Sequence, residues 1–233
     1  MSVSENIAGI RERIASAARR AGRRPEEIAL LAVSKTHPPK RVREAHAAGL
    51  RLFGENRVQE FTGKADALAD LAGAEWHMIG HLQTNKAGKA AELFSAVDSI
   101  DTLKLAEKLD SAARALNKHL SVLIEINVGG ETAKSGVAAD SNELEDLLQA
   151  ALRLEALKFR GLMTVPPFTD DPEGARHYFR KLRELRDATA ARKLPAVGVD
   201  VLSMGMSHDF EVAIEEGSTC VRVGTAIFGL REA

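Results

Sequence analysis

Short apolar segments alternate with amphipathic segments along most of the chain. The first apolar segment, residues 28–33, is too short for a helix and continuous enough to form a strand that is buried on both faces. The same pattern predicts seven further strands, at residues 50–53, 76–79, 96–100, 122–128, 159–163, 199–204 and 220–223. Helical patterns lie between these strands, among them residues 42–48, 103–116, 143–152 and 175–191.

One additional helix precedes the first strand. Ser2 and Glu5 have the spacing of a capping box, and isoleucines then recur on one helical face at positions 7, 10 and 14. Gly22 follows two arginines and is the expected end of this helix. The chain therefore begins with an amphipathic helix before the alternation starts.

Strands that alternate with helices pair in parallel through right-handed crossovers. Eight such units in 233 residues fit a TIM-type (β/α)8 barrel better than an open sheet. No linker or shift of composition marks a boundary, so we expect residues 1–233 to form a single α/β barrel domain with the extra N-terminal helix. In such barrels the chemistry is found where strands end, so residues just after each apolar segment are the candidates for a site.

Composition and charge narrow the classes of function. The chain is 45% hydrophobic, and its 32 basic and 33 acidic residues leave a formal net charge of -1. This balance argues against a nucleic-acid-binding or membrane-bound protein but not against a small charged ligand. Cys220 is the only cysteine and lies in an apolar run, which favours a buried strand residue. No signal peptide or membrane-spanning run is evident, so we expect a cytoplasmic protein.

Polar residues follow the first three strands. A lysine at the mouth of an apolar barrel is partly desolvated, so Lys35 is a candidate for Schiff-base formation, the alternative being a solvated loop lysine. Asn56 follows the second strand and either contacts a ligand or caps the next helix. His77 and His81 are four residues apart but in a strand followed by a glycine turn, which is not the helical geometry of a zinc site. His81 is a candidate for the wall of a pocket.

The last two strands end in small and hydroxyl residues. In these barrels the loops after the seventh and eighth strands usually hold phosphate, and here they contain Ser203, Ser207 and Thr225. Arg222 interrupts the apolar eighth strand, and a buried guanidinium needs a partner. Two partners remain open on this evidence, an ion pair with Glu125 or contact with a ligand.

Several runs together resemble the pyridoxal phosphate homeostasis protein family, whose members look like the barrel domain of alanine racemase standing alone. These runs are LLAVSKTHPP (31–39), FGENRVQE (53–60), WHMIGHLQTNK (76–86), SGV (135–137), RGLMTVP (160–166), LSMGMSHDFEVAI (202–214) and GSTCVRVGTAIFG (217–229). The resemblance covers essentially the whole chain. Arg57, Met78 and His208 depart from the family pattern at the rim of the site.

The resemblance implies a site for pyridoxal 5'-phosphate (PLP). Lys35 would form the internal aldimine with this cofactor, and Arg222 would face its pyridine nitrogen. The positions that match the phosphate cradle are Ser203, Gly224 and Thr225, with Met204 and Ser207 beside them. Those that match the cofactor-lining residues are Asn56, His81 and Met163.

The implied function is non-catalytic binding of PLP in intracellular vitamin B6 homeostasis, with an indirect effect on amino- and keto-acid metabolism. Arg222 cannot accept the proton that a carboxylate would keep on the pyridine nitrogen, and the only tyrosine, Tyr178, falls in an expected outer helix. The expected partners are PLP and apo-enzymes that use it, and the expected state is a monomer or weak dimer. The alternatives are a weak PLP-dependent amino-acid racemase and a Schiff-base aldolase without cofactor.

Overall fold

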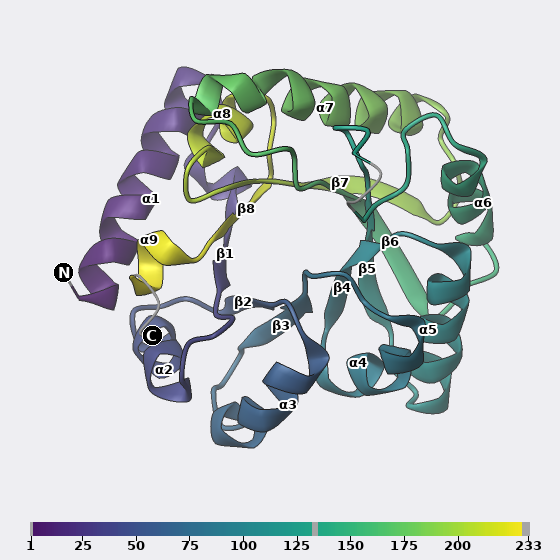
Figure 1. Ribbon diagram of the computed structural model, residues 1–233, viewed down its shortest axis with the longest axis horizontal. Helices are drawn as coiled ribbons and strands as arrows, with labels where there is room; N and C mark the ends of the chain where they lie inside the picture. The colour runs from purple at the N-terminus through teal and green to yellow at the C-terminus, as the bar shows by residue number, and fades with distance from the viewer. Residues whose placement is uncertain (1, 132–134, 230–233) are drawn as a thin grey trace.

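The computed structural model describes residues 2–131 and 135–229 of the chain. Within these residues eight parallel strands form a closed barrel and follow one another around the ring in sequence order, with β8 beside β1. Figure 1 shows the strands around a central opening and the helices outside them. The strands are β1 (Ala29–Val33), β2 (Leu52–Glu55), β3 (Glu75–Met78), β4 (Ala96–Ile100), β5 (Leu120–Glu125), β6 (Leu157–Met163), β7 (Val197–Met206) and β8 (Cys220–Val223).

The helices form an outer layer, and this arrangement confirms the predicted TIM-type (β/α)8 barrel with its extra N-terminal helix. They are α1 (Val3–Arg20), α2 (Pro39–Ala47), α3 (Val58–Ala65), α4 (Ala87–Leu93), α5 (Leu103–Ala115), α6 (Asn142–Ala150), α7 (Arg176–Ala191), α8 (Phe210–Glu215) and α9 (Thr225–Phe228). No helix in the described ranges is both long enough and apolar enough to cross a membrane.

Helix α1 begins and ends as the sequence predicts. The Ser2 hydroxyl accepts a hydrogen bond from the Glu5 amide, and the Glu5 carboxylate accepts one from the Ser2 amide, which completes the capping box. Gly22 has φ of 67°, the left-handed conformation that commonly ends a helix. The buried face of α1 packs against α2, α8 and α9, so this helix joins the first and last units of the ring.

Predicted strands and observed strands agree in order and differ at their ends. The second strand was predicted to start at Leu50, but Leu50 packs in the turn after α2, and β2 runs on to Glu55. The fifth was predicted to reach Val128, but β5 ends at Glu125 because the chain then forms a bridge between Ile126 and Val137. The sequence pattern gave no bounds for the short helices α3, α4 and α9.

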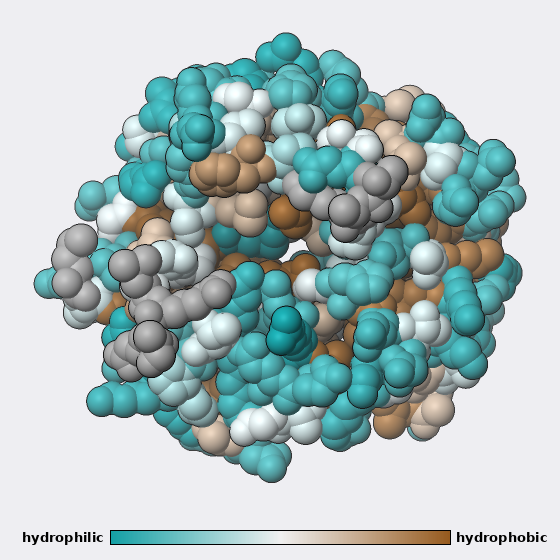
Figure 2. Space-filling model, in the orientation of Figure 1, coloured by the Kyte–Doolittle hydropathy of each residue, from teal (hydrophilic) through white to brown (hydrophobic). Residues whose placement is uncertain are grey.

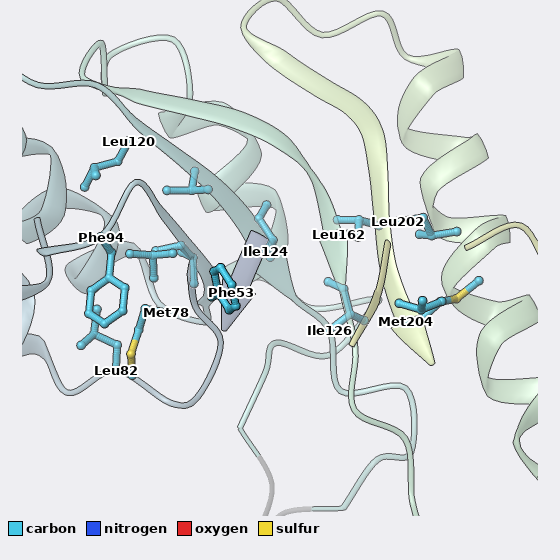
Figure 3. Packing of buried hydrophobic residues seen from close by; sticks show 14 of the residues in the cluster. Phe53, Met78, Leu82, Phe94, Leu120, Ile124, Ile126, Leu162, Leu202 and Met204 are labelled. Atoms are coloured by element: carbon cyan, nitrogen blue, oxygen red, sulfur yellow. The ribbon is translucent and has the colours of Figure 1, made fainter. Parts of the chain in front are cut away.

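Alternation along the strands separates two apolar cores. Outward-facing residues pack under the helices in one large cluster, part of which Figure 3 shows. The labelled members are Phe53, Met78, Leu82, Phe94, Leu120, Ile124, Ile126, Leu162, Leu202 and Met204. A smaller cluster contains Leu31, Val33 and Cys220 with Leu52, Ile79 and Val201 packed against them. Since its members alternate with the outer core, we assign this second cluster to the interior of the barrel.

Gly54 shows how tightly the interior is filled. A Cβ atom at this position would lie 2.4 Å from Leu31 Cδ2 and 2.9 Å from Ile79 Cδ1. Both of those side chains belong to the interior cluster, so Gly54 faces inward and lets them meet. The interior is therefore filled with side chains at this level, and folds of this kind bind ligands beyond such a layer, at the carboxyl ends of the strands.

Candidate functional site

The predicted site residues lie within or just after five strands. Leu31 and Val33 belong to the interior cluster, and Lys35 follows two residues after Val33, in the turn at the end of β1. The two-residue step of a strand leads from Cys220 to Arg222 within β8 and from Val201 to Ser203 within β7. Asn56, His81 and Gly224 follow the carboxyl ends of β2, β3 and β8. Figure 2 shows this face of the molecule hollowed at its centre, with both hydrophobic and hydrophilic residues around the hollow.

Lys35 lies in a tight turn at the end of β1. The preceding Ser34 is buried and its amide donates to the Gly54 carbonyl oxygen at 3.0 Å. The following Thr36 has φ of 65°, a left-handed conformation that is uncommon for a β-branched residue. The Thr36 amide donates to a Glu60 carboxylate oxygen, which holds this conformation in place. Lys35 itself is half-buried. The backbone on either side of Lys35 is therefore held by hydrogen bonds.

A second lysine, Lys64 of α3, holds that backbone. Its side chain is only 7% exposed, and its Nζ atom donates to the Ser34 carbonyl oxygen at 3.0 Å. The same atom lies 2.8 Å from Glu55 Oε1 and 3.3 Å from Glu60 Oε1. Burial raises the pKa of the Glu55 carboxyl, and the Lys64 ammonium opposes this shift. We refer to Ser34, Glu55, Glu60 and Lys64 as the lysine clamp.

Arg222 is held in the barrel interior by neutral groups. It is 3% exposed, and its guanidinium donates to Ser203 Oγ and to the Thr164 carbonyl oxygen, both at 2.7 Å. Burial lowers the pKa of Arg222. Among the described residues, no carboxylate oxygen lies within 4.0 Å of this guanidinium, so the alternative of a direct ion pair with Glu125 is wrong.

The loops after β7 and β8 meet at the mouth. The Gly224 amide donates to Ser207 Oγ at 3.3 Å, and Thr225 follows as an exposed residue at the start of α9. Ser203 lies lower, within β7, where it is fully buried. The Met204 side chain faces the opposite way and packs in the outer core near Leu202 (Figure 3). Of the residues matched to a phosphate cradle, Ser207, Gly224 and Thr225 thus lie at the loops.

Asn56 and His81 lie on one wall of the mouth. Both line a hollow of about 420 Å³ between the β2 and β3 loops. Asn56 does not cap the following helix, because α3 begins after Arg57 with no side-chain cap. Its Oδ1 atom is buried and has no hydrogen-bond partner among the described residues. His81 Nδ1 lies 3.0 Å from Asp101 Oδ2, which fixes the orientation of the imidazole ring.

Glu125 and Met163 lie across the mouth from β1. The strand register pairs Glu125 with Met163 and Met163 with Ser203, so these three residues form one inward-facing layer. Met163 is fully buried, and Glu125 is 6% exposed. Ser135 donates to Glu125 Oε1 at 3.0 Å. Sequence reasoning did not include Glu125 among the residues of the PLP site. A carboxylate at the end of an apolar strand is the feature that would have pointed to it.

His77 forms an ion pair in the interior below the mouth. Its Nδ1 atom lies 3.0 Å from Asp98 Oδ2, and both side chains are largely buried. Burial alone favours the neutral imidazole, but the charge and hydrogen bond of Asp98 outweigh it and raise the pKa of His77. His77 of β3 and His81 in the loop after β3 therefore contact two different aspartates, Asp98 and Asp101.

The raised pKa of His77 predicts a pH-dependent stability. The contribution of the charged pair is complete below the ordinary histidine pKa of about 6.5 and is lost as the pH rises through the folded-state pKa. We therefore expect the stability advantage of wild type over His77→Asn to be constant at pH values below about 6.5 and to fall as the pH rises above this value. Urea unfolding at several pH values measures it, with the exposed His119→Asn as control. An advantage that stays constant above about pH 6.5 would contradict the assignment.

Comparison with known proteins is consistent with this geometry. The model of the family described as alanine racemase, N-terminal domain, matches residues 6–232. A protein of Aquifex aeolicus named pyridoxal phosphate homeostasis protein is 48% identical over 232 residues, which cover 100% of each chain. A protein of the same name from Pseudomonas aeruginosa is 47% identical, covering 99% of this chain and 96% of its own.

Solved structures show the same similarity. PipY of Synechococcus elongatus, solved with PLP bound, is 35% identical with a TM-score of 0.84, covering 98% of this chain and 100% of its own. Alanine racemase of Clostridium difficile shares the fold, with a TM-score of 0.72 at 13% identity. The barrel, the whole-length matches and the family model lead to one conclusion: the chain belongs to the pyridoxal phosphate homeostasis protein family, which is built on the alanine racemase N-terminal domain.

Proposed function

We propose that this protein binds PLP through Lys35 and takes part in intracellular vitamin B6 homeostasis. The observation that carries the proposal is the convergence of Lys35, Arg222 and Gly224 on the adjoining strands β1 and β8, at the end of the barrel where such folds bind ligands. The PLP-bound structure of PipY, a relative of nearly the same length, supports the choice of ligand. We assign the whole chain, residues 1–233, to a single PLP-binding domain.

The residues at the mouth fit the chemical groups of this cofactor. Lys35 would hold the cofactor through its aldehyde, as a Schiff base formed with the loss of one molecule of water. Its phosphate would be held by Ser207, Gly224 and Thr225, where backbone amides and hydroxyls meet. Ser203, which orients Arg222, and Met204, which packs behind the loop, would act indirectly. Asn56, His81 and Met163 would line the remaining walls.

Arg222 suits a protein that holds the cofactor. Arginine offers five N–H donors and accepts no proton. Donors not engaged by Ser203 and Thr164 would be able to reach the pyridine nitrogen. An arginine there disfavours protonation of the ring, and an unprotonated ring stabilises negative charge on a substrate less well. Tyr178, the only tyrosine, lies on the outer helix α7.

These features favour a non-catalytic protein over the weak racemase. The relatives named above are called homeostasis proteins. We propose a cytoplasmic monomer or weak dimer that stores PLP and delivers it to apo-enzymes, with an indirect effect on amino- and keto-acid metabolism. Incubation of the PLP-loaded protein with amino acids in deuterated water distinguishes a non-catalytic protein from a weak racemase. A racemase would exchange the α-proton of the amino acid, and this exchange would depend on Lys35.

Phosphate recognition gives the direct test of this function. We expect the protein to bind PLP at least about 10-fold more tightly than pyridoxal, because a hydrogen bond to a charged group is worth about 1.5–3 kcal/mol. Ser207→Ala should reduce that preference, whereas Ser16→Ala on α1 should leave it unchanged. Absorbance titration with the two vitamers measures both affinities. Equal affinity for PLP and pyridoxal would refute the phosphate site.

A further inference from the structure

Glu125 carries a polar atom that the described residues leave without a partner. Its Oε2 atom is buried and accepts or donates no hydrogen bond among them, whereas Oε1 is engaged by Ser135. An unpaired buried polar atom costs about 1–3 kcal/mol. A cost of this size at the mouth of a binding barrel suggests that a ligand supplies the missing partner.

The position of Glu125 indicates which way this atom points. Its layer partners, Met163 and Ser203, lie on the inner wall, and Ser203 in turn binds Arg222. Three charged groups are near enough to influence Glu125 electrostatically: Asp101 after β4, His81 after β3 and Arg222 of β8. Among the described residues, neither His81 nor Arg222 lies within ion-pair distance of the Glu125 carboxyl group. Glu125 therefore faces the mouth from the side opposite β1.

The surroundings favour the neutral form of this side chain. Burial is the main cause that raises the pKa of Glu125, and the Asp101 carboxylate adds to it. The Ser135 hydrogen bond and the more distant Arg222 and His81 act in the opposite direction without cancelling the effect. A neutral carboxylic acid donates one hydrogen bond through its O–H group. In that form Oε2 meets a ligand atom that is an acceptor.

Besides the aldehyde, which is assigned to Lys35, PLP offers three kinds of acceptor, and two of these already have partners in the proposed site. The phosphate is assigned to the β7 and β8 loops and the pyridine nitrogen to Arg222, which leaves the phenolic oxygen of the ring. We propose that Glu125 binds this phenolic oxygen by donating a hydrogen bond from Oε2, with Ser135 orienting the carboxyl group through Oε1. The inference rests on the proposed PLP function.

A donor at the phenolic oxygen has a predictable spectroscopic effect. The nitrogen that would join Lys35 to the cofactor lies beside the phenolic oxygen and loses its proton as the pH rises. The phenolic oxygen would then carry full negative charge, and a hydrogen bond would stabilise that charged form. Removing the donor should therefore raise the pH at which the visible absorption band of the loaded protein changes. Glu125→Leu should move this midpoint upward by about one pH unit, whereas Glu125→Gln keeps an N–H donor and should stay near wild type.

The experiment is a pH titration of the visible band of PLP-loaded wild type, Glu125→Leu and Glu125→Gln, with the exposed Glu143→Leu on α6 as control. Ser135→Ala, which loosens the carboxyl group, should shift the midpoint in the same direction by less, and it serves if Glu125→Leu does not fold. A visible band in wild type with the same midpoint in Glu125→Leu would overturn this inference alone. No band in wild type would overturn the PLP function and the inference together.

Discussion

Replacing Lys64 with methionine should destabilise the fold by about 3–5 kcal/mol, the range measured when one partner of a buried ion pair is removed. The ammonium lies 2.8 Å from Glu55, whose side chain is fully buried, and 3.0 Å from the Ser34 carbonyl oxygen. The methionine side chain is similar in length to the aliphatic part of the lysine side chain, but it leaves the Glu55 carboxylate and the Ser34 carbonyl oxygen without this donor. Urea unfolding followed by circular dichroism measures the loss of free energy.

Matched variants distinguish the stability that is lost with the lysine clamp from the general effect of removing a positive charge. Lys40→Met, at an exposed position on α2, should change stability by less than about 0.5 kcal/mol. Adding Glu55→Gln to Lys64→Met should recover part of the loss, because no buried charge then remains without its partner. The loss in the single variant should grow as the pH rises, since burial already raises the pKa of Glu55 and ionisation is then uncompensated. A loss below about 1 kcal/mol would show that the clamp is unimportant.

Replacing Lys35 with alanine should weaken PLP binding by at least about 100-fold, equivalent to about 2.7 kcal/mol, because the covalent bond is lost while the phosphate contacts remain. The physical reason is positional. Lys35 is half-buried in the turn that follows β1, at the end of the barrel where such folds bind ligands.

Equilibrium dialysis against PLP measures this loss. Lys40→Ala is the matched control, since Lys40 lies five positions further along the chain and is exposed on α2. It should bind as wild type does. If Lys35→Ala retained wild-type affinity, binding would depend on the phosphate loops and Arg222, and the covalent bond would have no share in it.

The fold was predictable because each strand is short, apolar and bounded by polar residues. Buried parallel strands have this pattern and few other elements do. The ends of β2 and β5 were less predictable, since tertiary contacts decide them. Leu50 is apolar but packs in a turn, and residues beyond Glu125 bridge to Val137. Local pattern cannot distinguish an apolar residue in a strand from one that packs beside it.

Residues of the candidate site were also predictable, because strand ends and two-residue alternation locate Lys35, Arg222 and Gly224. Supporting contacts were not. Lys64 lies on a helix 29 positions after Lys35, and only the packing of α3 on the barrel brings it to the Ser34 carbonyl oxygen. The partners of Arg222 could not be assigned either, because a carbonyl oxygen such as that of Thr164 leaves no trace in a sequence.

Reduction of the PLP-loaded wild-type protein with borohydride, followed by peptide mapping, tests the central claim most directly. Reduction converts the Schiff base into a stable secondary amine, so the modified residue can be identified by mass. The lysine clamp and the place of Lys35 at the end of β1 predict that the adduct is on the peptide containing Lys35. An adduct found mainly on another lysine, or no adduct in a protein saturated with PLP, would contradict the proposed site.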